Sequence, residues 1–142
     1  RAIIQDRLQK GLPARPSPKE FAKQMFEMDV ENFTRNIHRA EVHFFDRSFL
    51  DSAALLYQAD KTCSSKIMDI LNTHRFNPKV FIGPPWKEIY RNDNERDQTL
   101  AEAEEVYRTM LDWYSLNGYK VITLPLASVD VRLRFVLHEL DL

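Results

Sequence analysis

Three short apolar runs, set among long helical patterns, constrain most strongly what this chain can fold into. The runs are residues 42–45, 79–82 and 119–124, and they are rich in β-branched and aromatic side chains. Short apolar strands separated by helical crossovers are typical of a parallel sheet that is covered on both faces. The pattern therefore predicts an α/β fold with a doubly wound parallel sheet. In such sheets the ligands bind at the carboxyl ends of the strands.

The helical patterns carry clear start and stop signals. Ser17, Pro18 and Glu20 form a capped helix start, and apolar residues then repeat at helical spacing to about residue 38. Thr99 and Glu102 form a second capping box. Glycines 11 and 118 are typical helix stops. Helices are predicted over residues 1–10, 17–38, 48–56, 63–74, 99–117 and 128–140.

The length and the charge balance bound the class of protein. A chain of 142 residues is expected to form one domain over residues 1–142. Its 20 basic and 21 acidic residues disfavour general nucleic-acid binding, which usually needs a basic excess. One cysteine excludes an internal disulfide framework and indicates the reducing cytoplasm. The apolar runs are far shorter than the roughly 20 residues that a membrane-spanning helix needs.

The first candidate site is the turn that follows the first apolar run. Asp46 there could hold Mg²⁺ through water or accept a proton, and Arg47 could hold phosphate oxygens. The alternative is structural: an ion pair or a helix cap at a strand-to-helix turn. Ser48 is well placed to cap the next helix, with Asp51 as its capping partner. Both interpretations stay open at this point.

The second candidate is the charged segment 87–98, in which seven of twelve residues are Asp, Glu, Lys or Arg. It follows a predicted strand, which places it above the expected site. Arg91 and Arg96 could clamp phosphate oxygens with two hydrogen bonds each. The alternative is a solvated loop whose arginines pair with neighbouring acidic residues.

Two segments resemble a known family. Residues 42–51 (VHFFDRSFLD) and 80–93 (VFIGPPWKEIYRND) are similar to motifs of AAA-domain ATPases, which are P-loop NTPases related to small nucleoside and nucleotide kinases. The early helices and residues 124–129 are also similar, so the resemblance covers nearly the whole chain. It implies a sheet of P-loop NTPase type. The family's first strand, P-loop and following helix would precede Arg1, so we expect this chain to be the larger C-terminal part of such a domain, inactive alone.

The resemblance implies catalytic roles for three residues. Asp46 would end a Walker-B-like strand and order the water of a bound Mg²⁺ or act as a base. Arg91 and Arg96 would be arginines of a lid over about residues 87–98, where they stabilise charge on the transferring phosphoryl group. Two further groups would bind ligand: the phosphate and substrate residues Arg47, Ser48 and Asp51, and the residues beside the nucleotide base, Ala127, Ser128 and Val129.

The function that these expectations describe is nucleotide chemistry with Mg²⁺ and ATP or GTP. The nucleotide would be hydrolysed, or its γ-phosphoryl group would pass to a small nucleoside-like or phosphorylated acceptor. The alternative is a nucleotide-gated binding or regulatory module without significant turnover. Both need the same phosphate site, so the sequence leaves them open.

Overall fold

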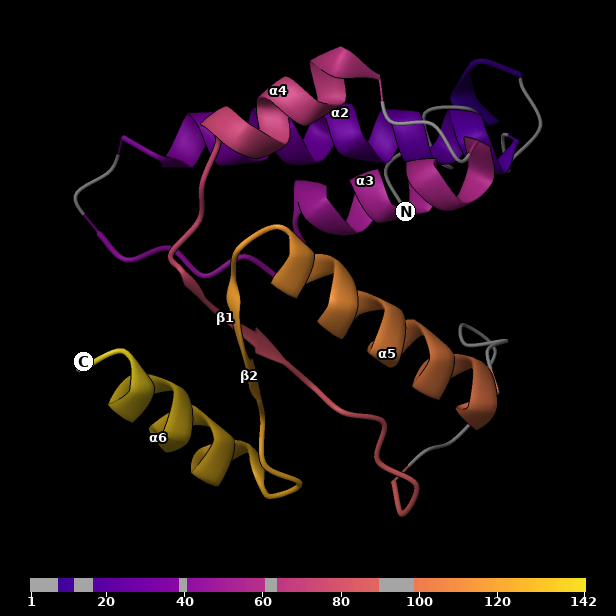
Figure 1. The fold of residues 1–142 in the computed structure, drawn as a ribbon. Helices are drawn as coiled ribbons and strands as arrows, with labels where there is room; N and C mark the ends of the chain where they lie inside the picture. The colour runs from indigo at the N-terminus through magenta and orange to yellow at the C-terminus, as the bar shows by residue number, and fades with distance from the viewer. Residues whose placement is uncertain (1–7, 12–16, 39–40, 61–63, 90–98) are drawn as a thin grey trace. The chain divides into compact units, whose positions relative to one another are not determined.

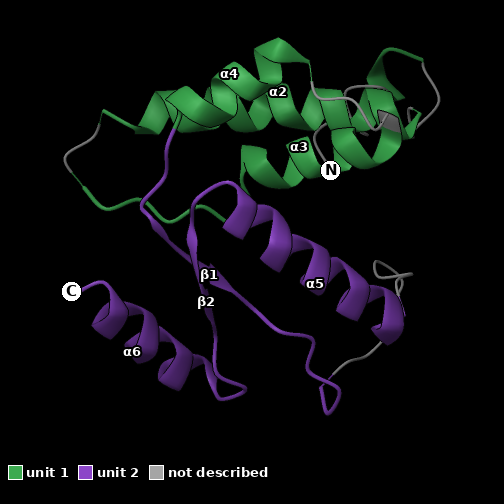
Figure 2. Cartoon of the chain, viewed as in Figure 1, with its two compact units in different colours: residues 1–74 green, residues 75–142 purple. Residues whose placement is uncertain are grey.

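A computed structural model describes residues 8–11, 17–38, 41–60, 64–89 and 99–142 (Figure 1). The chain divides into two compact units, residues 1–74 and residues 75–142 (Figure 2). Unit 1 holds α2 (Pro18–Asn36), α3 (Phe49–Asp60) and α4 (Ser65–Thr73). Unit 2 holds β1 (Lys79–Ile82), α5 (Leu100–Leu116), β2 (Lys120–Thr123) and α6 (Val129–Glu139). That residues 1–142 form a single domain stays a prediction.

The local start and stop signals are confirmed. The Ser17 side chain accepts a hydrogen bond from the Glu20 backbone N–H at 3.3 Å, and Pro18 is the first residue of α2. The predicted helix of residues 1–10 lies mostly outside the described residues. At its end Gly11 has φ +68° and donates its N–H to the Leu8 carbonyl, as a helix stop requires.

Unit 1 is built on aromatic packing between α2 and α3. Phe33 and Phe49 meet edge to face with their ring centroids 5.3 Å apart, and Phe26 approaches Phe49 in the same way at 6.4 Å. Phe49 is completely buried, which stabilises the fold by about 1.5–3 kcal/mol for such a side chain. Leu71 of α4 is also buried. Phe49 is the first residue of α3, so this packing fixes the place where that helix begins.

The predicted strand over residues 42–45 is wrong. This segment has no regular secondary structure and pairs with no other described strand. Phe45 packs on Phe33 at 6.3 Å, whereas the side chains of Val42 and Phe44 stay about 60% exposed. An apolar run supplies side chains for a strand, but a strand also needs a neighbouring backbone to bond with. The segment therefore leads into the turn before α3 as irregular chain.

Unit 2 contains a βαβ unit. β1 and β2 pair in parallel, with Lys79 opposite Lys120 and Ile82 opposite Thr123, and α5 connects them. The capping box of Thr99 and Glu102 is present at the start of α5, and Gly118 after its end has φ +80°. The structure is therefore α/β with a two-stranded parallel sheet. The larger doubly wound sheet stays a prediction.

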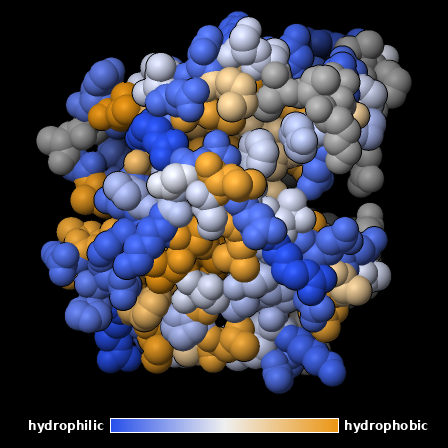
Figure 3. Space-filling view, in the orientation of Figure 1, coloured by the Kyte–Doolittle hydropathy of each residue, from blue (hydrophilic) through white to orange (hydrophobic). Residues whose placement is uncertain are grey.

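The helix predicted from residue 128 is confirmed as α6. Near the end of α6, the Glu139 carbonyl accepts a hydrogen bond from the ammonium group of Lys79 in β1. Two apolar residues of α6, Val129 and Leu133, are more than half exposed. Hydrophobic side chains are visible among hydrophilic ones on the face drawn in Figure 3.

Within the described ranges, no helix combines the length and the apolar character that a membrane span needs.

Candidate functional site

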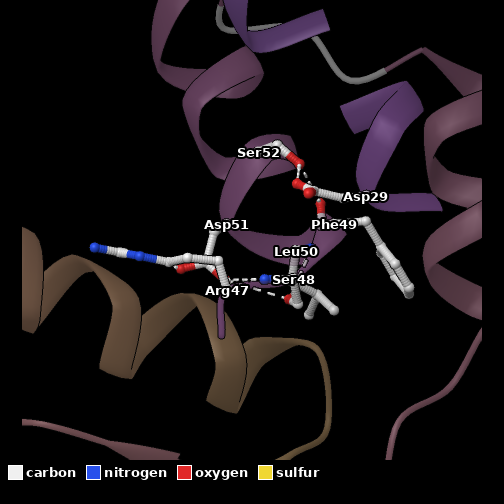
Figure 4. Close-up of polar contacts among 7 residues, drawn as sticks. All are labelled: Asp29, Arg47, Ser48, Phe49, Leu50, Asp51 and Ser52. Carbon is white, nitrogen blue, oxygen red and sulfur yellow. Dashed lines mark hydrogen bonds and ion pairs between the residues drawn. The ribbon is translucent and has the colours of Figure 1, made fainter. Parts of the chain in front are cut away.

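The candidate site in unit 1 is the turn between residues 42–45 and α3, drawn in Figure 4. Its central residue, Arg47, has φ +74°. An L-residue in this left-handed region brings Cβ close to the following carbonyl, at a cost of about 1–2 kcal/mol. Such strain persists only where the surroundings hold it, and it is concentrated at functional sites. The strained turn is therefore a candidate for a functional site.

Asp51 holds this turn together. One of its carboxylate oxygens accepts the Ser48 backbone N–H at 3.0 Å and the Ser48 hydroxyl at 3.2 Å. The other oxygen accepts a hydrogen bond from Nη1 of Arg47 at 3.4 Å. The Leu50 N–H in turn donates to the Ser48 hydroxyl at 3.1 Å. The predicted cap of Ser48 with Asp51 is thus confirmed. The roles of Ser48 and Asp51 toward a substrate stay predictions.

Asp46 differs from Asp51 because its side chain is not used by the turn. It is exposed, and in the described part of the chain it makes no hydrogen bond or ion pair. The structural alternative for the turn, an ion pair or cap, is therefore carried by Arg47, Ser48 and Asp51. The Asp46 carboxylate remains available to an external partner. The Arg47 side chain is 69% exposed, so its guanidinium can also reach a ligand.

The donor set of this turn suits Mg²⁺. This ion is bound through one or two carboxylates, while water and substrate phosphates fill its other positions. A single exposed, uncommitted carboxylate at Asp46 beside the exposed guanidinium of Arg47 meets that description. Among the residues that the structure describes, no group of three or more His, Cys, Asp or Glu side chains could hold a metal ion by itself. That Asp46 holds Mg²⁺ through water stays a prediction.

Sequence reasoning missed a polar contact that lies behind this turn. Ser52 of α3 is fully buried and donates its hydroxyl to the Asp29 carboxylate of α2 at 2.8 Å (Figure 4). Burial raises the pKa of Asp29 above its ordinary 3.8, the Ser52 hydrogen bond opposes the rise, and the Asp51 charge adds to it. The signal was present in the sequence, because Asp29 lies three residues after Phe26 and four before Phe33, on the apolar stripe.

The residues predicted beside the nucleotide base lie in unit 2, directly after β2. The Ala127 N–H donates to the Pro125 carbonyl at 2.9 Å, which closes a tight turn. Ser128 is the N-cap of α6 but makes no side-chain capping hydrogen bond, and Val129 is exposed. The backbone donors at the start of α6 are therefore not satisfied by the Ser128 side chain.

The structure brings together only the unit 1 part of the predicted site, namely Asp46, Arg47, Ser48 and Asp51. Arg91 and Arg96 lie outside the described residues, as does most of the predicted lid over 87–98. Just before that gap, the Ile89 N–H donates to the Trp86 carbonyl at 3.2 Å, so the segment begins with a turn. Ala127, Ser128 and Val129 are described within unit 2 alone.

Comparison with known proteins gives a family and no individual relative. The sequence model of the family described as "AAA domain" matches residues 1–132, which is nearly the whole chain. Neither a curated protein nor a solved structure matches.

Proposed function

Because this chain belongs to the AAA domain family, whose members are P-loop NTPase-like and bind nucleotides, we propose that it acts on ATP or GTP together with Mg²⁺. The chemistry is hydrolysis, or transfer of the γ-phosphoryl group to a small nucleoside-like or phosphorylated acceptor. The observation that carries this proposal is that the two carboxylates of the turn have different surroundings. Asp51 supplies the structural bonds, and Asp46 is left exposed beside the strained residue Arg47.

Each side chain of the turn has a distinct task in this proposal. The Arg47 guanidinium donates two hydrogen bonds to phosphate oxygens, with Asp51 holding its position. Asp46 accepts the proton of the attacking water or acceptor hydroxyl, or orders the water around Mg²⁺. Mg²⁺, when bound with the nucleotide, neutralises charge on the phosphate oxygens.

Two other segments complete the proposed site. Arg91 and Arg96 belong to a lid that closes on the phosphates, excludes water and stabilises the charge of the transferring group. Ala127, Ser128 and Val129 lie beside the base, where backbone donors that the Ser128 side chain does not cap suit its polar edge. The family resemblance supports both assignments.

The test is Asp46→Asn in the protein that carries this chain. An amide keeps the size of the carboxylate but neither accepts a proton nor carries charge, so turnover should fall about a hundredfold or more. The unfolding temperature should stay unchanged, because Asp46 bonds to no described residue. Asp69→Asn, an exposed carboxylate on α4, is the matched control and should leave both quantities unchanged.

Two results would contradict this proposal. Equal turnover by Asp46→Asn and the wild-type protein would remove Asp46 from the chemistry. A fall in the unfolding temperature with unchanged turnover per folded molecule would make Asp46 a structural residue of the turn.

A further inference from the structure

The contact between Asp29 and Ser52 is a hydrogen bond between α2 and α3 that lies beside buried apolar side chains. The neighbours of Asp29 one turn away on α2 are Phe26 and Phe33, and both are buried. Ser52 lies among the buried residues Phe49 and Ala53 of α3. The 2.8 Å bond between the Ser52 hydroxyl and the Asp29 carboxylate joins two helices across 23 residues of sequence. Apolar side chains alone would pack these helices without removing a carboxylate from water.

Such a hydrogen bond constrains the position of the two helices because it is directional. Apolar contacts are non-directional and tolerate small shifts of one helix along another, whereas a hydrogen bond weakens steeply away from its preferred geometry. The Ser52 hydroxyl also lies 3.3 Å from the Phe49 carbonyl, which ties it to the start of α3. The contact therefore fixes the first turn of α3 against α2.

That first turn is where the proposed phosphate site is anchored. Asp51, next to Ser52, holds the Ser48 N–H and the Arg47 guanidinium, as Figure 4 shows. We propose that Asp29 is a positioning residue that acts through Ser52 and Asp51 to hold Arg47 and Ser48 in place. This inference rests on the proposed function for its effect on turnover, but not for its effect on the geometry of the turn.

The test uses Asp29→Ala, Ser52→Ala, the double variant and Asp29→Asn in the protein that carries this chain. Asparagine keeps an oxygen that accepts from Ser52 and loses only the charge. Glu27→Ala is the matched control, because Glu27 is an exposed carboxylate of the same helix. The first readout is amide hydrogen exchange at Ser48, compared with the His74 amide, which donates to the Ile70 carbonyl at the end of α4.

We expect Asp29→Ala and Ser52→Ala each to speed exchange at Ser48 several-fold and to leave His74 unchanged. Their nucleotide turnover should fall about tenfold, since a small misplacement of a positioned group is costly, and the double variant should lose no more than either single variant. Asp29→Asn and Glu27→Ala should match the wild-type protein in both readouts.

Unchanged exchange at Ser48 in Asp29→Ala would overturn the inference, and so would equal acceleration at Ser48 and His74, because that is the result of a merely structural role. If the wild-type protein lacks nucleotide turnover, the proposed function fails, and the exchange at Ser48 still decides the positioning role by itself.

Discussion

Arg47 occupies a backbone conformation that its own side chain disfavours. At φ +74° a glycine would be relaxed, so Arg47→Gly removes strain of about 1–2 kcal/mol. Glycine gives the unfolded chain more freedom, which costs about 0.5–1 kcal/mol. The ion pair with Asp51, in which the Arg47 side chain is exposed, contributes about 1 kcal/mol. These effects nearly cancel. We therefore expect the free energy of unfolding to change by less than about 1 kcal/mol.

The effect on ligand binding should be much larger, since Arg47→Gly removes the guanidinium that is proposed to hold phosphate oxygens. We expect the affinity for ATP with Mg²⁺, measured by calorimetry, to fall at least about tenfold. Arg47→Lys keeps the charge and the strained backbone but cannot donate two parallel hydrogen bonds to phosphate oxygens. Its affinity for ATP with Mg²⁺ should therefore lie between those of the wild-type protein and Arg47→Gly. Wild-type affinity in Arg47→Gly would show that the strain at this residue serves no phosphate site.

At the scale of single elements, the capping box of α5 makes the stability of that helix depend on pH. The backbone N–H and the hydroxyl of Thr99 both donate to the Glu102 carboxylate. These two hydrogen bonds, of which the backbone one has the larger effect, lower the pKa of Glu102 below its ordinary 4.5. The folded state therefore releases this proton more readily than the unfolded chain. The cap stabilises α5 above the ordinary pKa, and its contribution is lost as the pH falls through the lowered value.

This prediction is measured as the protection of the Glu102 N–H against hydrogen exchange, because this group donates to the Thr99 hydroxyl. Protection should drop as the pH falls below the ordinary pKa of 4.5 and through the lowered value, while the interior of α5 changes less. Glu102→Gln keeps a side-chain acceptor that does not titrate, so its protection should not follow pH. A matching pH dependence in Glu102→Gln would assign the effect to another group.

The elements also show which parts of this fold can be read from sequence. The starts of α2 and α5 and the bounds of β1 were predictable, because caps and short apolar runs act within a few residues. The strand predicted at 42–45 was wrong, because a strand depends on a partner far along the chain, which a short apolar run does not reveal. The same distinction holds in the site. Asp51 lies three residues from Ser48 and its cap was predicted, whereas the bond from Ser52 to Asp29 spans 23 residues and was missed.

At the scale of the whole molecule, nucleotide binding must appear as added stability, because a ligand that binds only the folded state favours it by mass action. At a concentration 100 times the dissociation constant, ATP with Mg²⁺ should raise the free energy of unfolding by about 2.7 kcal/mol. Asp46→Asn should keep this rise and lose turnover, whereas Arg47→Gly should lose the rise.

Amide exchange then reports on the two predicted parts of the site separately. Protection by the nucleotide should appear at Ser48 in unit 1 and at Ser128 in unit 2, because the proposal assigns phosphate contacts to the first and the base to the second. Protection at Ser48 alone would remove Ala127, Ser128 and Val129 from the site. A full rise in stability without any turnover would instead favour a nucleotide-gated binding module, because occupation of the phosphate site would then be separated from the chemistry assigned to Asp46.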